Sequence, residues 1–290
     1  MRWRRSAHGE TPRTYDADVT YDVPTSLSPS RVEAFTSCPM LFRFVSIEKI
    51  DDPPSIHTTR GSLVHRALQL AFSYRPAQRT ASLFAMSASC AIEEFRHDPD
   101  VTRLGLDDQQ TEQLFADCRR LVDNFLSMED PTAVRAIGLE LSLSTQIDGL
   151  TLRGIIYRLE LRDGELVVTD YKTGRPPSVN WELRSLSGVR FYALLCKAVF
   201  GRMPAAIRLM YLSTGEVIEA TPSEQATRFV ATRTAAVWKA VERACVTGDF
   251  QPHPTALCEL CAFRPWCPAF GGDPDRARLE APIAFGLTPA

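Results

Sequence analysis

Four cysteines at the two ends of the chain place the strongest constraint on its fold. Cys258, Cys261 and Cys267 form a C-x2-C-x5-C group near the C-terminus, and Cys38 stands alone far upstream. Thiolates at such spacing are typical of metal sites, because a short loop can aim several sulfur atoms at one centre. A fourth ligand from Cys38 would fasten the two ends of the fold together.

The composition narrows the class of protein. The 290 residues are 44% hydrophobic, which is enough for one large domain or two small ones. The formal net charge of −2 excludes a globally basic protein, so a nucleic-acid surface would have to be a local groove. We expect no secretory signal and no membrane partner. Eight cysteines without such a signal then indicate a reducing cytoplasm.

The order of periodic segments predicts a mixed α/β fold. Residues 1–24 are expected to be a flexible tail and residues 272–290 a loose one. Apolar positions at helical spacing and capping residues predict helices at about 28–38, 61–74, 83–95, 111–128, 183–200 and 223–245. Alternation and Asp-Gly turns predict strands at about 137–147, 150–161, 165–172, 207–212 and 217–220. Helices, a three-stranded meander and a further helix–strand unit would surround one central sheet.

Asp170-Tyr171-Lys172 is the first candidate for chemistry. Residues two apart in a strand point to the same face, so Asp170 and Lys172 would stand side by side at a strand end. A carboxylate can hold Mg²⁺ or Mn²⁺, and a lysine can orient a water and offset phosphate charge. Alone, the pattern is a weak signal and is far more often a surface ion pair.

Further pieces occur in a specific order around this motif. They are Gly61-x-x-x-His65 on a helix, Gly154-x-x-Tyr157-Arg158 on the preceding strand, and Tyr192 on the following helix. With the split cysteine set, residues 25–271 resemble the RecB-like PD-(D/E)xK nucleases, including the iron–sulfur nucleases of CRISPR adaptation and of helicase–nuclease complexes. The resemblance implies a restriction-endonuclease-like core, a mixed central sheet flanked by helices. It also implies an N-terminal helical insertion and a C-terminal cluster-binding segment.

The same resemblance implies roles for individual residues. His65, Asp170 and the carbonyl of Tyr171 would hold Mg²⁺ or Mn²⁺, and Lys172 would be the catalytic lysine. Tyr192 would be the tyrosine of a Q-x-x-x-Y element that contacts DNA or positions the active site. The four cysteines, Cys38, Cys258, Cys261 and Cys267, would hold a structural [4Fe–4S] cluster. Their spacing alone fits Zn²⁺ equally well.

Two positions depart from the family pattern. Tyr157 stands where an aspartate that bridges the metal is expected, and a phenol with a pKa near 10 is a poor ligand for a hard cation. Glu140 could substitute, because it points off the apolar face of its strand and so towards the same groove. Strand alternation puts Glu160 on the opposite face and makes it the weaker substitute. Gly188 replaces the glutamine four residues before Tyr192.

The sequence therefore predicts a metal-dependent DNA exonuclease, acting on single-stranded DNA in repair or recombination, alone or beside a helicase. Arg175, Arg184 and Arg190 are candidates for phosphate contacts, although they could equally form a solvated face. Arg158 is a further candidate for DNA binding. The first alternative is a catalytically impaired module that keeps the fold and binds DNA, because of Tyr157. The second is a zinc-ribbon protein with an unrelated α/β domain.

Overall fold

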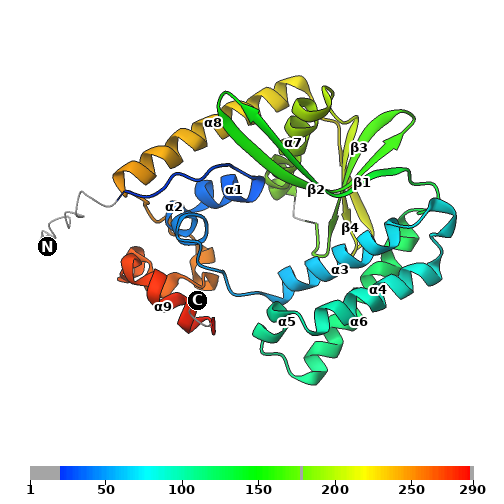
Figure 1. Cartoon of the computed structure of the whole chain (residues 1–290), viewed down its shortest axis with the longest axis horizontal. Coiled ribbons are helices and arrows are strands. Elements are labelled where there is room, and N and C mark those ends of the chain that lie inside the picture. Colours follow the sequence, from blue (N-terminus) through cyan, green and yellow to red (C-terminus); the bar gives the residue numbers. More distant parts are fainter. Residues whose placement is uncertain (1–19, 177–178, 288–290) are drawn as a thin grey trace, which may run out of the picture.

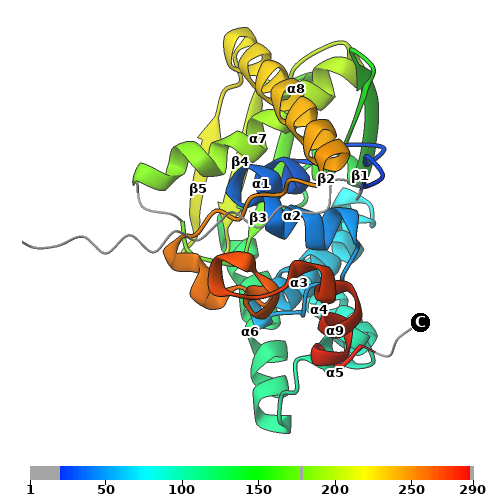
Figure 2. The same ribbon diagram turned by 90° about the vertical axis from the view of Figure 1, so that its left-hand side faces the viewer.

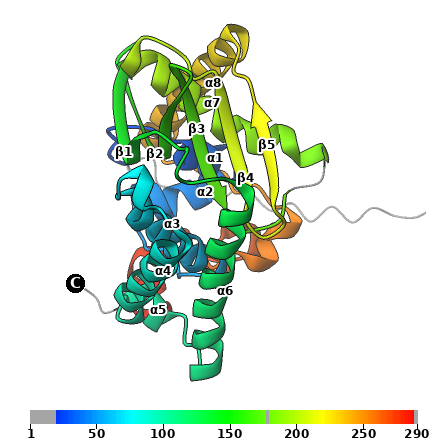
Figure 3. The same ribbon diagram turned by 90° about the vertical axis from the view of Figure 1, so that its right-hand side faces the viewer.

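The fold is built on one mixed sheet. The computed structural model describes residues 20–176 and 179–287, and within 179–189 it describes the backbone alone. The strands run in the order β1 (Ala136–Ile147), β2 (Leu150–Arg162), β3 (Glu165–Lys172), β4 (Ala206–Tyr211) and β5 (Glu216–Ala220). Figure 3 shows them side by side, with β1 and β5 at the two edges. The strand order makes β3, which carries the Asp-x-Lys motif, the central strand. Among the paired strands, only β3 and β4 are parallel.

Two tight turns create the meander β1–β2–β3. Asp148-Gly149 and Asp163-Gly164 connect its strands, and all four residues have positive φ angles, between 50° and 83°. A two-residue hairpin turn with positive φ at both positions matches the right-handed twist of the strands that it joins. These turns therefore bring β3 back beside β2, with the Asp-x-Lys end of β3 opposite the Gly154–Arg158 stretch.

One face of the sheet is covered by α7 (Val179–Phe200), α8 (Glu224–Thr247) and α1 (Pro29–Ser37), as Figure 1 shows. Helix α7 is the crossover that makes β3 and β4 parallel. The core on this face includes Ile156 of β2, Val168 of β3, Leu195 of α7 and Val241 of α8, all at most 1% exposed.

The other face is covered by α3 (Ile56–Phe72), α4 (Ala81–Arg96) and α6 (Asp108–Met128), with the short α5 (Pro99–Arg103) between the last two. Their apolar stripes form a second core with Tyr171 of β3 and Met210 of β4. Helix α3 begins five residues before the predicted start at residue 61, because Ser55 and Thr58 form a capping box. This group is the predicted helical insertion, and the fold class is confirmed.

Residues from near the two ends of the chain meet and join the core on the α7–α8 face of the sheet. After α1 come α2 (Pro39–Phe42) and a π-helical turn (Arg43–Ile47), which lie close to α9 (Ala277–Ala284) in Figure 2. The guanidinium Nη2 of Arg43 lies 2.6 Å from Oδ1 of Asp275. Single 3₁₀ turns at 256–260, 264–266, 268–270 and 274–276 connect α8 to α9.

The loose tail predicted for residues 272–290 is wrong for the part that the structure describes. Ala277 and Ala281 of α9 are fully buried, and Trp266 donates a hydrogen bond from Nε1 to Glu280 at 3.0 Å. Of the predicted N-terminal tail, residues 1–19 lie outside the described residues, and Tyr21 already donates its backbone N–H to Cys245. Within the described ranges, no helix has the length and apolar character needed to cross a membrane.

Gly154 is required where β2 approaches α7. A Cβ atom at this position would lie 2.6 Å from Cδ1 of the fully buried Leu195, too close without a shift of that side chain. We expect Gly154→Ala to lower the free energy of unfolding by about 1–3 kcal/mol, measured by urea denaturation. In the control Gly61→Ala, the new Cβ meets nothing nearer than 3.9 Å. That helix-interior change should raise stability by up to about 1 kcal/mol, and equal effects of the two variants would contradict the packing argument.

Candidate active site

Asp170 and Lys172 form the centre of the candidate site, at the C-terminal end of β3. Nζ of Lys172 lies 2.8 Å from Oδ2 of Asp170, and Asp170 is only 4% exposed. Burial opposes the charge of the lysine, but the Asp170 carboxylate outweighs it and raises the pKa of Lys172. The pair therefore joins a buried carboxylate to a lysine whose side chain is 43% exposed, and a fully solvated surface ion pair does not describe it.

His65 reaches this unit from α3. Its Nε2 lies 2.8 Å from the carbonyl oxygen of Tyr171, which can only accept, so Nε2 carries the proton. Burial lowers the pKa of His65, although the nearby Asp170 carboxylate partly opposes that shift. A neutral imidazole is the form that binds metals. Its other nitrogen, Nδ1, lies 3.9 Å from Oε1 of Glu140.

Glu140 lies across the strand pair from Tyr157, at a kink in both strands. The register of the flanking residues places the two opposite each other. On β1, Leu139 packs into the α3–α4–α6 core and Leu141 into the α7–α8 core, so alternation breaks at Glu140. Glu140 has a φ of +46°, which is uncommon for a residue with a side chain and costs of order 1–3 kcal/mol. The kink turns the Glu140 carboxylate towards His65 and Asp170.

Tyr157 and Tyr192 complete the cluster. The Tyr157 ring packs against the His65 ring, with 3.9 Å between the centroids and 57° between the planes. Burial raises the pKa of Tyr192, and the nearby Asp170, Tyr157 and Glu140 raise it further. The pKa of Tyr157 is raised for the same main reason, burial, so both phenols are neutral at pH 7. The structure thus brings together all the residues predicted for the active site.

The prediction that Arg158 contacts DNA is wrong, because its side chain is fully buried. Its guanidinium lies 2.7 Å from Glu129 and 3.1 Å from Glu160, on the α3–α4–α6 side of the sheet. Glu160 is itself 2% exposed and bonded to arginines, which agrees with its predicted place away from the site.

The other candidate phosphate contacts are more accessible. Arg175 is exposed in the loop after β3, and Arg190 is partly exposed on α7. The side chain of Arg184, like the position of Gly188, lies outside the part of the chain whose side chains are described. A role of Arg175 and Arg190 in DNA binding stays a prediction.

The carboxylates and the imidazole of this cluster are groups that bind divalent cations, although they are not placed closely enough to form a complete metal site. Among the described residues, no group of three or more His, Cys, Asp or Glu side chains is placed so that it could hold a metal ion. Two buried atoms of this cluster nevertheless lack a hydrogen-bond partner among the described residues, Oδ1 of Asp170 and Nδ1 of His65. An unpartnered buried carboxylate oxygen is costly unless a cation or water meets it. Asp170 thus presents a free acceptor where a cation could bind.

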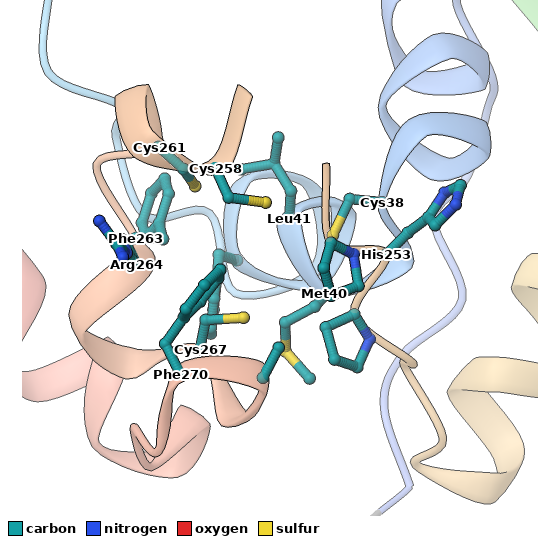
Figure 4. A pocket seen from close by; sticks show the side chains of 14 residues that line it. Cys38, Met40, Leu41, His253, Cys258, Cys261, Phe263, Arg264, Cys267 and Phe270 are labelled. Atoms are coloured by element: carbon teal, nitrogen blue, oxygen red, sulfur yellow. The ribbon is translucent and has the colours of Figure 1, made fainter. Parts of the chain in front are cut away.

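The four predicted cysteine ligands share one pocket, although, among the described residues, they are not placed closely enough to form a group that could hold a metal ion. Cys38, Cys258, Cys261 and Cys267 line one pocket between the start of α2 and the C-terminal turns, and Figure 4 shows their sulfur atoms turned towards it. Burial raises the pKa of the Cys261 thiol, and the three other cysteines raise it further. Thiolates gathered in one pocket would repel one another, so a bound cation or cluster would stabilise the deprotonated form of these cysteines.

The pH dependence of stability should report on Glu140. Burial, and then the Asp170 carboxylate, raise its pKa from 4.5 to about 7. The folded protein therefore holds a proton that the unfolded chain releases, and stability falls as the pH rises from about 4.5 to about 7. The loss has an upper limit of about 3 kcal/mol. We expect metal-free Glu140→Gln to lack this decrease when both proteins are unfolded by urea across that range. Parallel profiles of the two proteins would contradict the assignment.

Comparison with known proteins agrees with this geometry. A model of the PD-(D/E)XK nuclease superfamily matches residues 26–268. The chain is 24% identical to the Gene 69 protein of Mycobacterium phage D29 over 271 residues, which cover 84% of this chain and 96% of that protein. It is 30% identical to the Gene 69 protein of Mycobacterium phage L5 over 135 residues, 46% of this chain and 44% of that one.

A solved structure from Eubacterium rectale, named as a candidate exonuclease, has a similar fold. It superposes with a TM-score of 0.53 at 10% identity, covering 82% of this chain and 87% of that chain. At this identity the likeness concerns the fold alone.

Proposed function

Because the chain belongs to the PD-(D/E)XK nuclease superfamily, we propose that it is a DNA exonuclease that depends on Mg²⁺ or Mn²⁺. The observation that carries the proposal is the pairing of the buried Asp170 carboxylate with Lys172. One oxygen of Asp170 lies 2.8 Å from the lysine, and the other accepts no hydrogen bond from the described residues. The name of the Eubacterium rectale protein supports exonuclease activity.

Asp170, Glu140, His65 and the carbonyl of Tyr171 would hold the ion, and His65 would then give up its hydrogen bond to that carbonyl. A bound divalent cation polarises the scissile phosphate and lowers the pKa of a coordinated water. Lys172, which stays charged beside Asp170, orients that water and offsets the negative charge of the phosphate. Tyr192, neutral and beside Asp170, donates a hydrogen bond to the DNA backbone.

In this proposal, Glu140 is the anionic metal ligand in place of the aspartate that is missing at position 157. It stands opposite Tyr157 in the strand register, and its pKa is raised first by burial and then by repulsion from the nearby Asp170 carboxylate. A cation between the two carboxylates would remove that repulsion and release the proton from Glu140. The affinity for the ion should therefore increase as the pH rises through about 7.

A second function is favoured by one observation, the packing of the Tyr157 ring on His65 at 3.9 Å. The Tyr157 phenol fills the space beside His65, a proposed metal ligand, and carries no negative charge at pH 7. In this alternative the protein binds DNA without cleaving it.

The finer points of the proposal rest on the resemblance to RecB-like nucleases. They are a preference for single-stranded DNA, a role in repair or recombination, and action alone or beside a helicase. A [4Fe–4S] cluster on Cys38, Cys258, Cys261 and Cys267 is supported by the shared pocket that they line, with Zn²⁺ as the alternative.

The test is degradation of end-labelled single-stranded and double-stranded DNA by protein purified without oxygen, with Mn²⁺ or Mg²⁺. We expect metal-dependent release of nucleotides from DNA ends, which Lys172→Ala abolishes. The matched control is Lys197→Ala on α7, whose ammonium pairs with Glu224 away from the site and whose loss should leave activity unchanged. Intact DNA in every reaction, with DNA binding preserved in the wild-type protein, would support the binding module instead.

A further inference from the structure

A network of buried charges lies directly behind the active-site strand. Its centre is Arg158 of β2, the largest fully buried side chain among those described. Its guanidinium stands over the Phe72 ring at 4.9 Å and over the Tyr171 ring at 5.6 Å. Burying a guanidinium is costly unless its donors are satisfied, so the partners of Arg158 show what the structure keeps in place.

Glu129 is the partner that joins neighbouring strands. It is the C-cap residue of α6, and its two carboxylate oxygens accept from different strands. Oε2 accepts from Arg158 of β2 at 2.7 Å, and Oε1 accepts from Arg208 of β4 at 2.6 Å. One side chain at a helix end thus links the two strands that flank β3.

The donors of Arg158 bind β3 on both sides of Asp170. Nη2 donates to Oγ1 of Thr169 at 3.2 Å, and Nη1 donates to the hydroxyl of Tyr171 at 2.8 Å. Because side chains alternate along a strand, Thr169 and Tyr171 face the network while Asp170 and Lys172 face the active site. The backbone carbonyl of Tyr171 is the group that accepts from His65. The residues held by Arg158 are therefore the immediate neighbours of the groups that would bind the metal.

We propose that Glu129 and Arg158 are positioning residues, which set the place of Asp170 and of the Tyr171 carbonyl by holding the Thr169 and Tyr171 side chains. This inference rests on the proposed metal site but concerns residues that touch neither metal nor DNA. A purely apolar core could stabilise this region as well as the ion pairs do. The planar guanidinium additionally fixes the orientation of the side chains that it contacts, since it sets the angles of several hydrogen bonds at once.

The mildest test is Tyr171→Phe, which removes one hydroxyl and keeps the buried ring. The readout is the side-chain ¹⁵N and proton signals of His65, whose Nε2 proton reports on the bond to the Tyr171 carbonyl. We expect these signals to shift in Tyr171→Phe, although residue 171 keeps its carbonyl. This readout does not need metal to be bound.

The second test is Glu129→Gln, with Glu219→Gln as the matched control. Both carboxylates contact Arg208, but only Glu129 also contacts Arg158. Mn²⁺ affinity is measured by calorimetry below the unfolding temperature of each protein. Changes to groups that orient metal ligands typically cost 10–100-fold in affinity or activity. We therefore expect Glu129→Gln and Tyr171→Phe to weaken Mn²⁺ binding by at least about 10-fold, and Glu219→Gln to leave it unchanged.

The outcomes separate the two proposals. Unchanged His65 signals in Tyr171→Phe and in Glu129→Gln would overturn the positioning role, even if both variants were less stable. A wild-type protein that binds no Mn²⁺ would overturn the metal-dependent function, while the His65 signals would still decide the positioning role. Shifted signals together with weaker Mn²⁺ binding would support both.

Discussion

Replacing Tyr157 with aspartate is expected to raise the Mn²⁺-dependent nuclease activity by at least about 100-fold. The phenol is neutral at pH 7 because burial raises its pKa, so it contributes no anionic ligand. An aspartate on the same strand position would face Glu140 and lie beside Asp170, and three carboxylates would then surround the ion. The measurement is kcat/KM on end-labelled single-stranded DNA at saturating Mn²⁺.

The control for this substitution is Tyr157→Asn, which has the same size as aspartate and no charge. It relieves the packing on His65 but adds no anionic ligand. A gain in Tyr157→Asp alone would show that the missing charge limits the enzyme. An equal gain in both variants would show that the bulk of the phenol limits it. If neither variant gained activity, Tyr157 would not be what restrains the site.

Replacing Cys267 with serine is expected to detach the C-terminal turns and α9 from α2 and to lower the unfolding temperature by more than about 10 °C. The four cysteines line one pocket but come from opposite ends of the chain. Ligand binding there supplies folding free energy, because the unfolded chain has no such site. The measurements are thermal unfolding, iron, sulfide and zinc content, and the visible absorption of the purified protein.

Cys90→Ser is the matched control, because Cys90 is an exposed residue of α4 far from the pocket in sequence. It should leave metal content and unfolding temperature unchanged. If the purified protein contained zinc but no iron or sulfide, the four cysteines would hold a zinc ion and not an iron–sulfur cluster. Full stability of metal-free Cys267→Ser would show that apolar packing and the Arg43–Asp275 pair alone hold the two ends together.

The regular elements could be predicted from the sequence because their patterns are local. The Asp-Gly turns define the meander, and the apolar stripes of α4, α6 and α8 have helical spacing. Helix α9 was missed because the residues that it buries, Ala277 and Ala281, are small and form no conspicuous stripe. Pro282 also lies within its last turn and argued against a helix.

The active-site residues were predictable, but their surroundings were not. Asp170, Lys172 and His65 belong to short motifs, and the fold brings them together. The burial of Arg158 depends on Glu129, which is 29 residues away in the sequence and has no motif of its own. No pattern in the sequence indicates that Glu140 adopts a positive φ, since that angle arises where β1 changes from one core to the other.

Because residues from near the two ends of the chain pack together, the fold can be completed only late in synthesis. Cys38 and its three partners are separated by most of the chain, and translation adds about 5–20 residues per second. Roughly 10–45 seconds therefore pass between the synthesis of Cys38 and that of Cys258. In the last part of that interval, once residue 220 has been added, the sheet with Asp170 and Lys172 is complete, while the C-terminal turns that carry Cys258, Cys261 and Cys267 are still missing. A nascent chain would thus contain Asp170 and Lys172 before it contains the C-terminal turns, and any activity that needs the complete fold would begin only after Cys267 has been made.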